Sequence, residues 1–175
     1  MGAFSGLKDA SRGFSSNPIR AGRYAVRIDG CDFFEARAGE KWKNTLTVLA
    51  VEDGGEKPHK VGETVHTFFN CKAGKEGKEI FQRNLKSFMA GVLDVGDEEI
   101  GEDEATVASS DDSPLKGLVT IVTVRMQASK DKVDEQGNPR MYPVYGWDAS
   151  LEPEQIEELL GEEGMAKFFP NGFGE

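Results

Sequence analysis

The order of hydrophobic patterns along this chain constrains its fold more than any single residue does. Apolar and polar residues alternate from Gly22 to about Phe34, with a bulge or bend expected at Gly30. Residues 75–93 differ, because apolar residues recur there every three or four positions, which is typical of an amphipathic helix. Stretches rich in β-branched and aromatic residues predict four further strands. These strands lie at 41–52, 63–70, 115–127 and 141–147.

Three strands, one helix and two more strands predict a mainly β protein. This order is that of a five-stranded OB-fold barrel with one α-helix between strands 3 and 4. An immunoglobulin-like sandwich needs about seven strands and no long helix, and a doubly wound α/β fold needs helices between most strands. We therefore expect an OB-fold domain at 21–147, after a flexible N-terminal arm at 1–20 and before an acidic C-terminal extension at 148–175. Pro143 should place the last strand at an edge or a bulge.

The distribution of charge matters more than its sum. A formal net charge of -10 over 175 residues argues at first against a nucleic-acid partner. However, residues 92–113 hold nine acidic and no basic side chains, and residues 148–175 hold eight acidic side chains and one basic. The rest of the chain carries a net charge of +6, so the predicted barrel is basic and its appendages are acidic. We expect the acidic loop at about 94–113 to be disordered or loosely held.

The sequence predicts neither an enzyme nor a cofactor. It contains no G-x-x-x-x-G-K-[ST], G-x-G-x-x-G, H-E-x-x-H or G-x-S-x-G signature. Cys31, His59, His66 and Cys71 could supply four zinc ligands, but only the last two approach the close spacing of structural zinc sites. We expect the two cysteines to be reduced and partly buried. With no long apolar run and no signal peptide in view, we expect a cytoplasmic protein.

Three stretches carry a resemblance to a known family. Residues 22–55, 60–70 and 77–92 read GRYAVRIDGCDFFEARAGEKWKNTLTVLAVEDGG, KVGETVHTFFN and GKEIFQRNLKSFMAGV. Together they resemble the small bacteriophage single-stranded DNA-binding proteins with an OB fold. The resemblance implies binding of single-stranded DNA without sequence preference in phage DNA replication, recombination or repair, within the host cell cytoplasm. The acidic end, EEGMAKFFPNGFGE, is similar to the tails that recruit replication partners, although Gly174 and Glu175 follow its last Phe.

The OB fold predicts where a nucleic acid would bind. Such barrels use strands 2 and 3 and the loops after strands 1 and 4, with cations for the phosphates and aromatic rings for the bases. Residues of these types at these places, and two strand arginines, form the predicted interface: Arg27, Arg37, Lys41, Trp42, Lys43, Phe68, Lys72, Arg125, Lys130, Lys132, Arg140 and Tyr142. Phe68 and Phe69 cannot both face outward. Strand 2 is apolar on both faces, so Trp42 could face either the DNA or the core.

The C-terminal extension has two interpretations. Residues 153–160 form a short helix that either packs on the barrel or belongs to an exposed acidic peptide. We favour the exposed peptide, in which Phe168, Phe169 and Phe173 bind a replication or recombination protein and the acidic groups compete with DNA. Deleting residues 148–175 should then tighten DNA binding. The alternative function is an OB-fold protein-interaction or assembly module that does not bind DNA, and a homo-oligomer is compatible with either function.

Overall fold

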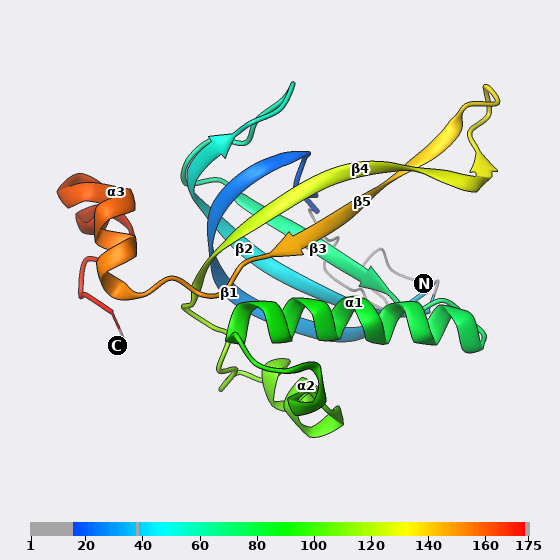
Figure 1. Cartoon of the computed structure of the whole chain (residues 1–175), viewed down its shortest axis with the longest axis horizontal. Helices are drawn as coiled ribbons and strands as arrows, with labels where there is room; N and C mark the ends of the chain where they lie inside the picture. The colour runs from blue at the N-terminus through cyan, green and yellow to red at the C-terminus, as the bar shows by residue number, and fades with distance from the viewer. Residues whose placement is uncertain (1–15, 38, 174–175) are drawn as a thin grey trace, which may run out of the picture.

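The protein is described by a computed structural model that covers residues 16–37 and 39–173. Its five strands form one antiparallel sheet in the order β3-β2-β1-β4-β5 (Figure 1). The strands are β1 (Gly22–Ala36), β2 (Gly39–Asp53), β3 (Thr64–Asn70), β4 (Val119–Val133) and β5 (Pro139–Trp147). The predicted mainly β architecture is confirmed. The last strand lies at a sheet edge, as its proline predicted.

The central strand is β1, which pairs with both β2 and β4. The register between β1 and β2 shifts between Ile28 and Gly30, which confirms the predicted irregularity at that glycine. Tyr24, Val26 and Ile28 are each fully buried, because alternate side chains of a strand point to the same face. This alternation places the main hydrophobic core on one side of the sheet.

Helix α1 (Lys75–Leu93) covers that side of the sheet (Figure 1). The centroid of the Phe88 ring on this helix lies 4.6 Å from the centroid of the Trp147 ring on β5 and 5.9 Å from that of the Phe69 ring on β3. The helix therefore fastens both edge strands to one core. Its buried residues are Phe81, Leu85, Phe88, Met89, Ala90 and Val92.

The sheet is not closed into a barrel. In the described residues the two edge strands, β3 and β5, share no backbone ladder, and side chains span the gap between them. The rings of Phe69 and Tyr145 meet edge to face with their centroids 5.9 Å apart. The edge strands are therefore held together by packing on α1 and by ring contacts.

Part of the β3 edge is covered by the N-terminal segment. Pro18 forms a parallel bridge with His66, and the backbone N–H of Ile19 donates to the His66 carbonyl at 2.9 Å. Ile19 is only 4% exposed. Residues 16–20 are thus docked, contrary to the prediction of a flexible arm, and residues 1–15 of that arm lie outside the described residues.

Strands β4 and β5 continue beyond their predicted bounds of 115–127 and 141–147 into the residues between them. Their two-stranded ribbon extends beyond the body of the protein (Figure 1), and we call residues 125–144 the arm. Its turn is fixed by the Asp134 carboxylate, which accepts N–H bonds from Gln136 and Asn138 at 2.9 Å each. Gly137 has a φ of 84°, a conformation that glycine adopts without steric cost.

The acidic segment, predicted to be disordered or loosely held, contains regular secondary structure. It contains the 3₁₀-helix η1 (Asp97–Glu99) and the helix α2 (Glu102–Ala108). Ile100 and Ala108 are 4% and 0% exposed and belong to the main core. Two apolar anchors therefore hold the segment while its carboxylates face solvent.

The C-terminal extension packs on the sheet, so the favoured prediction of a free peptide is wrong for its described residues. Helix α3 (Pro153–Phe168) buries Ile156 against Leu49 of β2 and Val119 of β4. These three side chains form a second cluster, separate from the core beneath α1. The burial of these apolar side chains explains why the acidic C-terminal extension packs on the sheet. Its net charge does not predict this packing.

Two further findings concern membranes and metals. No helix among the described residues is long and apolar enough to cross a membrane. Within the same residues no three metal-binding side chains gather, and both cysteines are free thiols. His59 and His66 accept hydrogen bonds from the backbone N–H groups of Arg20 and Asn17, at 3.0 and 3.1 Å.

Candidate functional site

A cleft of about 710 Å³ opens at the gap between the two edge strands. β3 and the N-terminal half of α1 form one side, and the arm forms the other. The rings of Tyr145 and Trp147 contribute to its inner wall. Because the sheet is open here, the cleft reaches from solvent to the edge of the main core.

Cations surround the cleft, and none of the described residues that line it is acidic. The four cations come from three separate elements: Lys72 after β3, Arg83 on α1, and Lys132 and Arg140 on the arm. None of the four forms an ion pair with a described carboxylate within 4.0 Å. The cleft therefore has an excess of positive charge that the neighbouring described side chains leave uncompensated.

Two of these cations influence each other's charge. The Lys132 ammonium, within hydrogen-bonding reach and of like charge, lowers the pKa of Lys72. Two ammonium groups repel each other unless an anion is shared between them. An anionic group such as a phosphate would relieve this repulsion.

The cleft also presents apolar and aromatic groups to solvent. Tyr142 is 43% exposed and Met141 is 54% exposed on the arm, and Ile80 is 42% exposed across from them on α1. Burial raises the pKa of Tyr145 to about 12, despite a hydrogen bond to the backbone of Phe68. The site thus combines a fixed aromatic wall with exposed groups that can contact a flat ligand.

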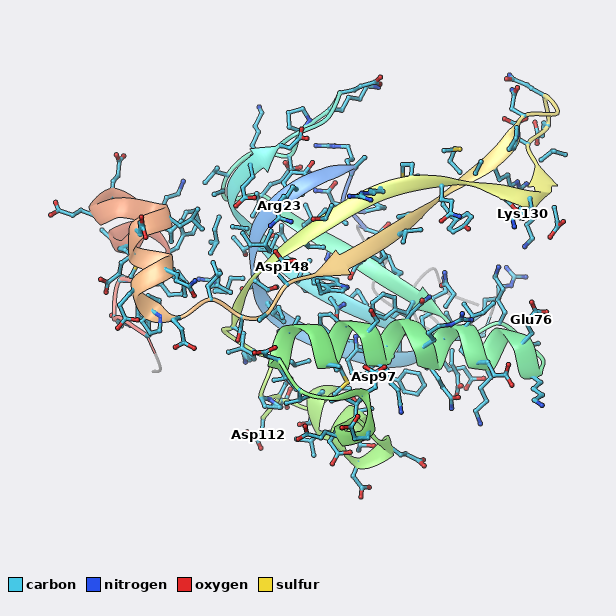
Figure 2. All side chains as sticks on the ribbon, in the orientation of Figure 1. Arg23, Glu76, Asp97, Asp112, Lys130 and Asp148 are labelled. Atoms are coloured by element: carbon cyan, nitrogen blue, oxygen red, sulfur yellow. The ribbon has the colours of Figure 1, made fainter. Side chains whose placement is uncertain are left out.

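The arm carries much of the exposed apolar surface of the described chain. Large apolar side chains more than 40% exposed occur on both of its strands: Met126, Val133, Met141, Tyr142 and Val144. Figure 2 shows Lys130 near the outer end of the ribbon, well away from the core. Exposed apolar groups concentrated on one element mark a binding surface more often than a structural one.

The structure brings five of the predicted interface residues together in the cleft. They are Phe68, Lys72, Lys132, Arg140 and Tyr142. Phe68 is half-buried while Phe69 is 3% exposed, which confirms that only one of the pair faces the core. Arg125 and Lys130 lie on the arm outside the cleft, and Arg37 is exposed at the β1–β2 turn.

Three of the predicted contacts, all on β2, do not line the cleft. Trp42 is 2% exposed and donates to the Asn44 amide oxygen at 2.6 Å, so no base can stack on it. The Lys43 ammonium lies 3.2 Å from Asp32 and its side chain is 14% exposed. Lys41 is half-buried on the same strand, and it does not line the cleft.

Arg27 contacts the C-terminal extension. Its guanidinium donates to Asp29 at 2.8 Å and to the carbonyl of Phe168 at 2.8 Å, and it lies 5.6 Å from the centroid of the Phe169 ring. Phe169 in turn contacts Phe173 at 5.0 Å between centroids. Phe168 and Phe169 are therefore half-buried in contacts within the chain, and their binding to a partner stays a prediction.

Sequence reasoning missed Arg83, Ile80 and Trp147. The amphipathic pattern assigned Arg83 to the polar face of the helix, where a cation is usually a solubilising group. Its position three residues after the exposed Ile80 was the available signal, since residues at this spacing share a helix face. Trp147 carried no such signal, because its position depends on how β5 meets α1.

Comparison with known proteins adds no identification. No protein-family model matches this chain, and a search of curated proteins gives no significant match.

Proposed function

We propose that this protein binds single-stranded DNA without sequence preference, and that the cleft between β3, α1 and the arm is the binding site. The observation that carries the proposal is one cleft that combines exposed apolar and aromatic groups with four cations, none of them paired with a described carboxylate, and that has no acidic residue in its described lining. Phosphates are attracted to the cations, and each neutralised phosphate releases counterions. Unstacked bases contact the apolar groups, an interaction that tolerates any base.

Single strands fit this chemistry better than duplexes do. In a duplex the bases are stacked on each other, and only their edges are accessible to a protein. The exposed groups of the cleft, above all Tyr142 and Met141, offer flat or flexible apolar surface rather than an array of hydrogen-bond donors. Such groups bind base faces, which only a single strand exposes.

Our proposal also includes the assignment of the sheet to the OB fold. We infer that the sheet is an OB barrel left open between β3 and β5, since an OB fold is a five-stranded and partly open barrel. The neighbours observed, β3-β2-β1-β4-β5, would form a closed ring if β3 met β5. Together with the resemblance of residues 22–92 to the phage DNA-binding proteins, this supports a role in phage DNA replication, recombination or repair.

The test is a fluorescence titration of the full chain with dT12 and with a 12-base-pair duplex. Trp147 lines the cleft, so dT12 should quench its emission, and the Trp147→Phe variant should lose this response. The double variant Lys72→Ala/Arg140→Ala should bind dT12 more weakly. The control Lys116→Ala removes an exposed lysine outside the cleft and should bind as the wild type does.

Two results would overturn the proposal. Equal affinity for duplex and single strand would show general polyanion binding, and an undisturbed affinity in the double variant would place any DNA elsewhere. Absence of binding to dT12 by the folded wild-type protein would favour a protein-interaction module instead.

A further inference from the structure

A second hollow adjoins the cleft along α1. It has a volume of about 880 Å³ and lies over the C-terminal half of the helix. Both hollows are lined by Arg83, Ser87 and Trp147. Because they share these three side chains, the two hollows form one groove that follows α1 from the arm toward the end of the helix.

The groove follows one stripe of the helix surface. Ile80, Arg83 and Ser87 line its first part, and Ala90 and Asp94 line its second part. These positions recur every three or four residues, so they share a face. From the first to the last the helix rises about 21 Å, at about 1.5 Å per residue.

The floor of the groove is closed where β5 meets α1. A Cβ atom at Gly91 would lie 3.0 Å from the carbonyl oxygen of Trp147 and 3.3 Å from its Cβ atom. Glycine at this position lets the strand end pack directly on the helix. A ligand leaving the cleft therefore passes over Trp147 rather than between the two elements.

The charge of the described lining changes along the groove. The cleft end holds Lys72, Lys132 and Arg140, with Arg83 at the junction, and the second hollow adds Lys86. The Lys86 ammonium donates to the backbone carbonyl of Asp97 at 3.2 Å, so it is held over the groove. Two acidic residues also line this hollow, Asp94 at the end of the helix and Asp97 beside Lys86. Figure 2 shows Asp97 beneath the C-terminal half of α1.

We infer that a DNA strand bound in the cleft continues along α1, over Trp147 to Lys86, and ends at Asp94 and Asp97. This inference rests on the proposed function and adds the length and the limit of the site. Each cation along the stripe attracts the phosphates of the strand, and the two carboxylates repel them. A stacked strand rises about 3.4 Å per nucleotide and an unstacked strand is more extended, so the 21 Å stripe accommodates at most roughly six nucleotides, which overlaps the range of about 4 to 16 for OB folds.

The test compares a short and a long oligonucleotide on the full chain. Lys86→Ala should weaken binding of dT12 by about threefold to fivefold, as expected for one exposed ionic contact, and should leave binding of dT4 within twofold. The matched control is Lys78→Ala, which removes an exposed lysine of the same helix that lines neither hollow. It should bind both oligonucleotides as the wild type does.

A second variant tests the acidic limit. Asp94 has a left-handed conformation with a φ of 55°, which asparagine also tolerates. Asp94→Asn/Asp97→Asn should therefore fold normally, and it should bind dT12 more tightly while its affinity for dT4 stays unchanged. Thermal unfolding of each variant checks that the helix is intact.

The outcomes separate the inference from the proposed function. If Lys86→Ala weakens dT4 and dT12 equally, or weakens neither while the cleft variants remain defective, the continuation along α1 is wrong and the cleft stands. If the wild-type protein binds neither oligonucleotide, the proposed function itself fails, and this inference fails with it.

Discussion

The salt dependence of DNA binding is the most quantitative consequence of the cleft. Four cations line it, and each phosphate contact of a single strand contributes about -0.7 to the slope of log Kobs against log salt concentration. Four contacts therefore predict a slope of about -2.8. Raising the salt from 50 to 200 mM should weaken binding roughly 50-fold by this slope.

Removing one cation should change that slope by a fixed amount. Arg140 is exposed on the arm and lines the cleft, so Arg140→Ala should fold normally and give a slope of about -2.1. The same salt increase should then weaken binding only about 18-fold.

The assay is quenching of Trp147, which lines the cleft, by 5′-phosphorylated dT4, which offers four phosphates for the four cations. Titrations at four salt concentrations give the slope for each variant. Lys116→Ala serves as the control and should keep the wild-type slope. An unchanged slope in Arg140→Ala, or an equal change in the control, would refute the assignment of these cations to phosphates.

Further predictions concern stability and reactivity. Trp42→Ala should lower the free energy of unfolding by about 3 to 5 kcal/mol, measured by urea denaturation, because the ring is buried in the core. Ile156→Ala should increase amide exchange throughout α3 and leave dT4 affinity unchanged, since no described residue of α3 lines the cleft; tighter binding would revive the competing-tail hypothesis. Burial raises the pKa of Cys31 to about 12, so a thiol reagent at pH 8 should modify only the half-buried Cys71 in the folded protein, and labelling of two thiols would contradict this. Hydrogen bonds from the Lys60 N–H and the Asn17 amide lower the pKa of Glu63 to about 2. The ionised Glu63 carboxylate therefore stabilises the fold above pH 4.5, and this contribution disappears as the pH falls toward 2. Glu63→Gln should lower the free energy of unfolding, measured by urea denaturation, at pH 7 and not at pH 2.

The strands could be predicted because their side chains follow a simple alternation. Tyr24, Val26 and Ile28 showed it in β1, and the same rule separated Phe68 from Phe69. It failed at Trp42, because β2 carries apolar residues on both faces and is buried on both faces at 46–49. One face of β2 contacts the main core and the other is covered by α3. Apolar residues therefore occur on both faces, and the sequence pattern does not show which face points to the main core.

The missed elements share a different cause. The arm has no core to face, so it shows no alternation, and its strands are specified by the turn at Asp134 instead. The acidic segment and α3 are dominated by exposed carboxylates, which conceal a few apolar anchors such as Ile100 and Ile156. Net charge describes what a segment presents to solvent and does not reveal whether a buried side chain fixes it. The cleft itself depends on the gap between β3 and β5, which sequence periodicity does not encode.

An open sheet has unpaired edges, and unpaired edges invite association with other chains. This protein blocks them in two ways. Residues 17–19 lie along part of β3 through the bridge between Pro18 and His66, while β5 carries Pro139 and Pro143, which have no N–H to donate to an added strand. The chain can therefore keep a permanent gap in its sheet without recruiting strands from other copies, and the gap stays available to a ligand that needs no backbone pairing.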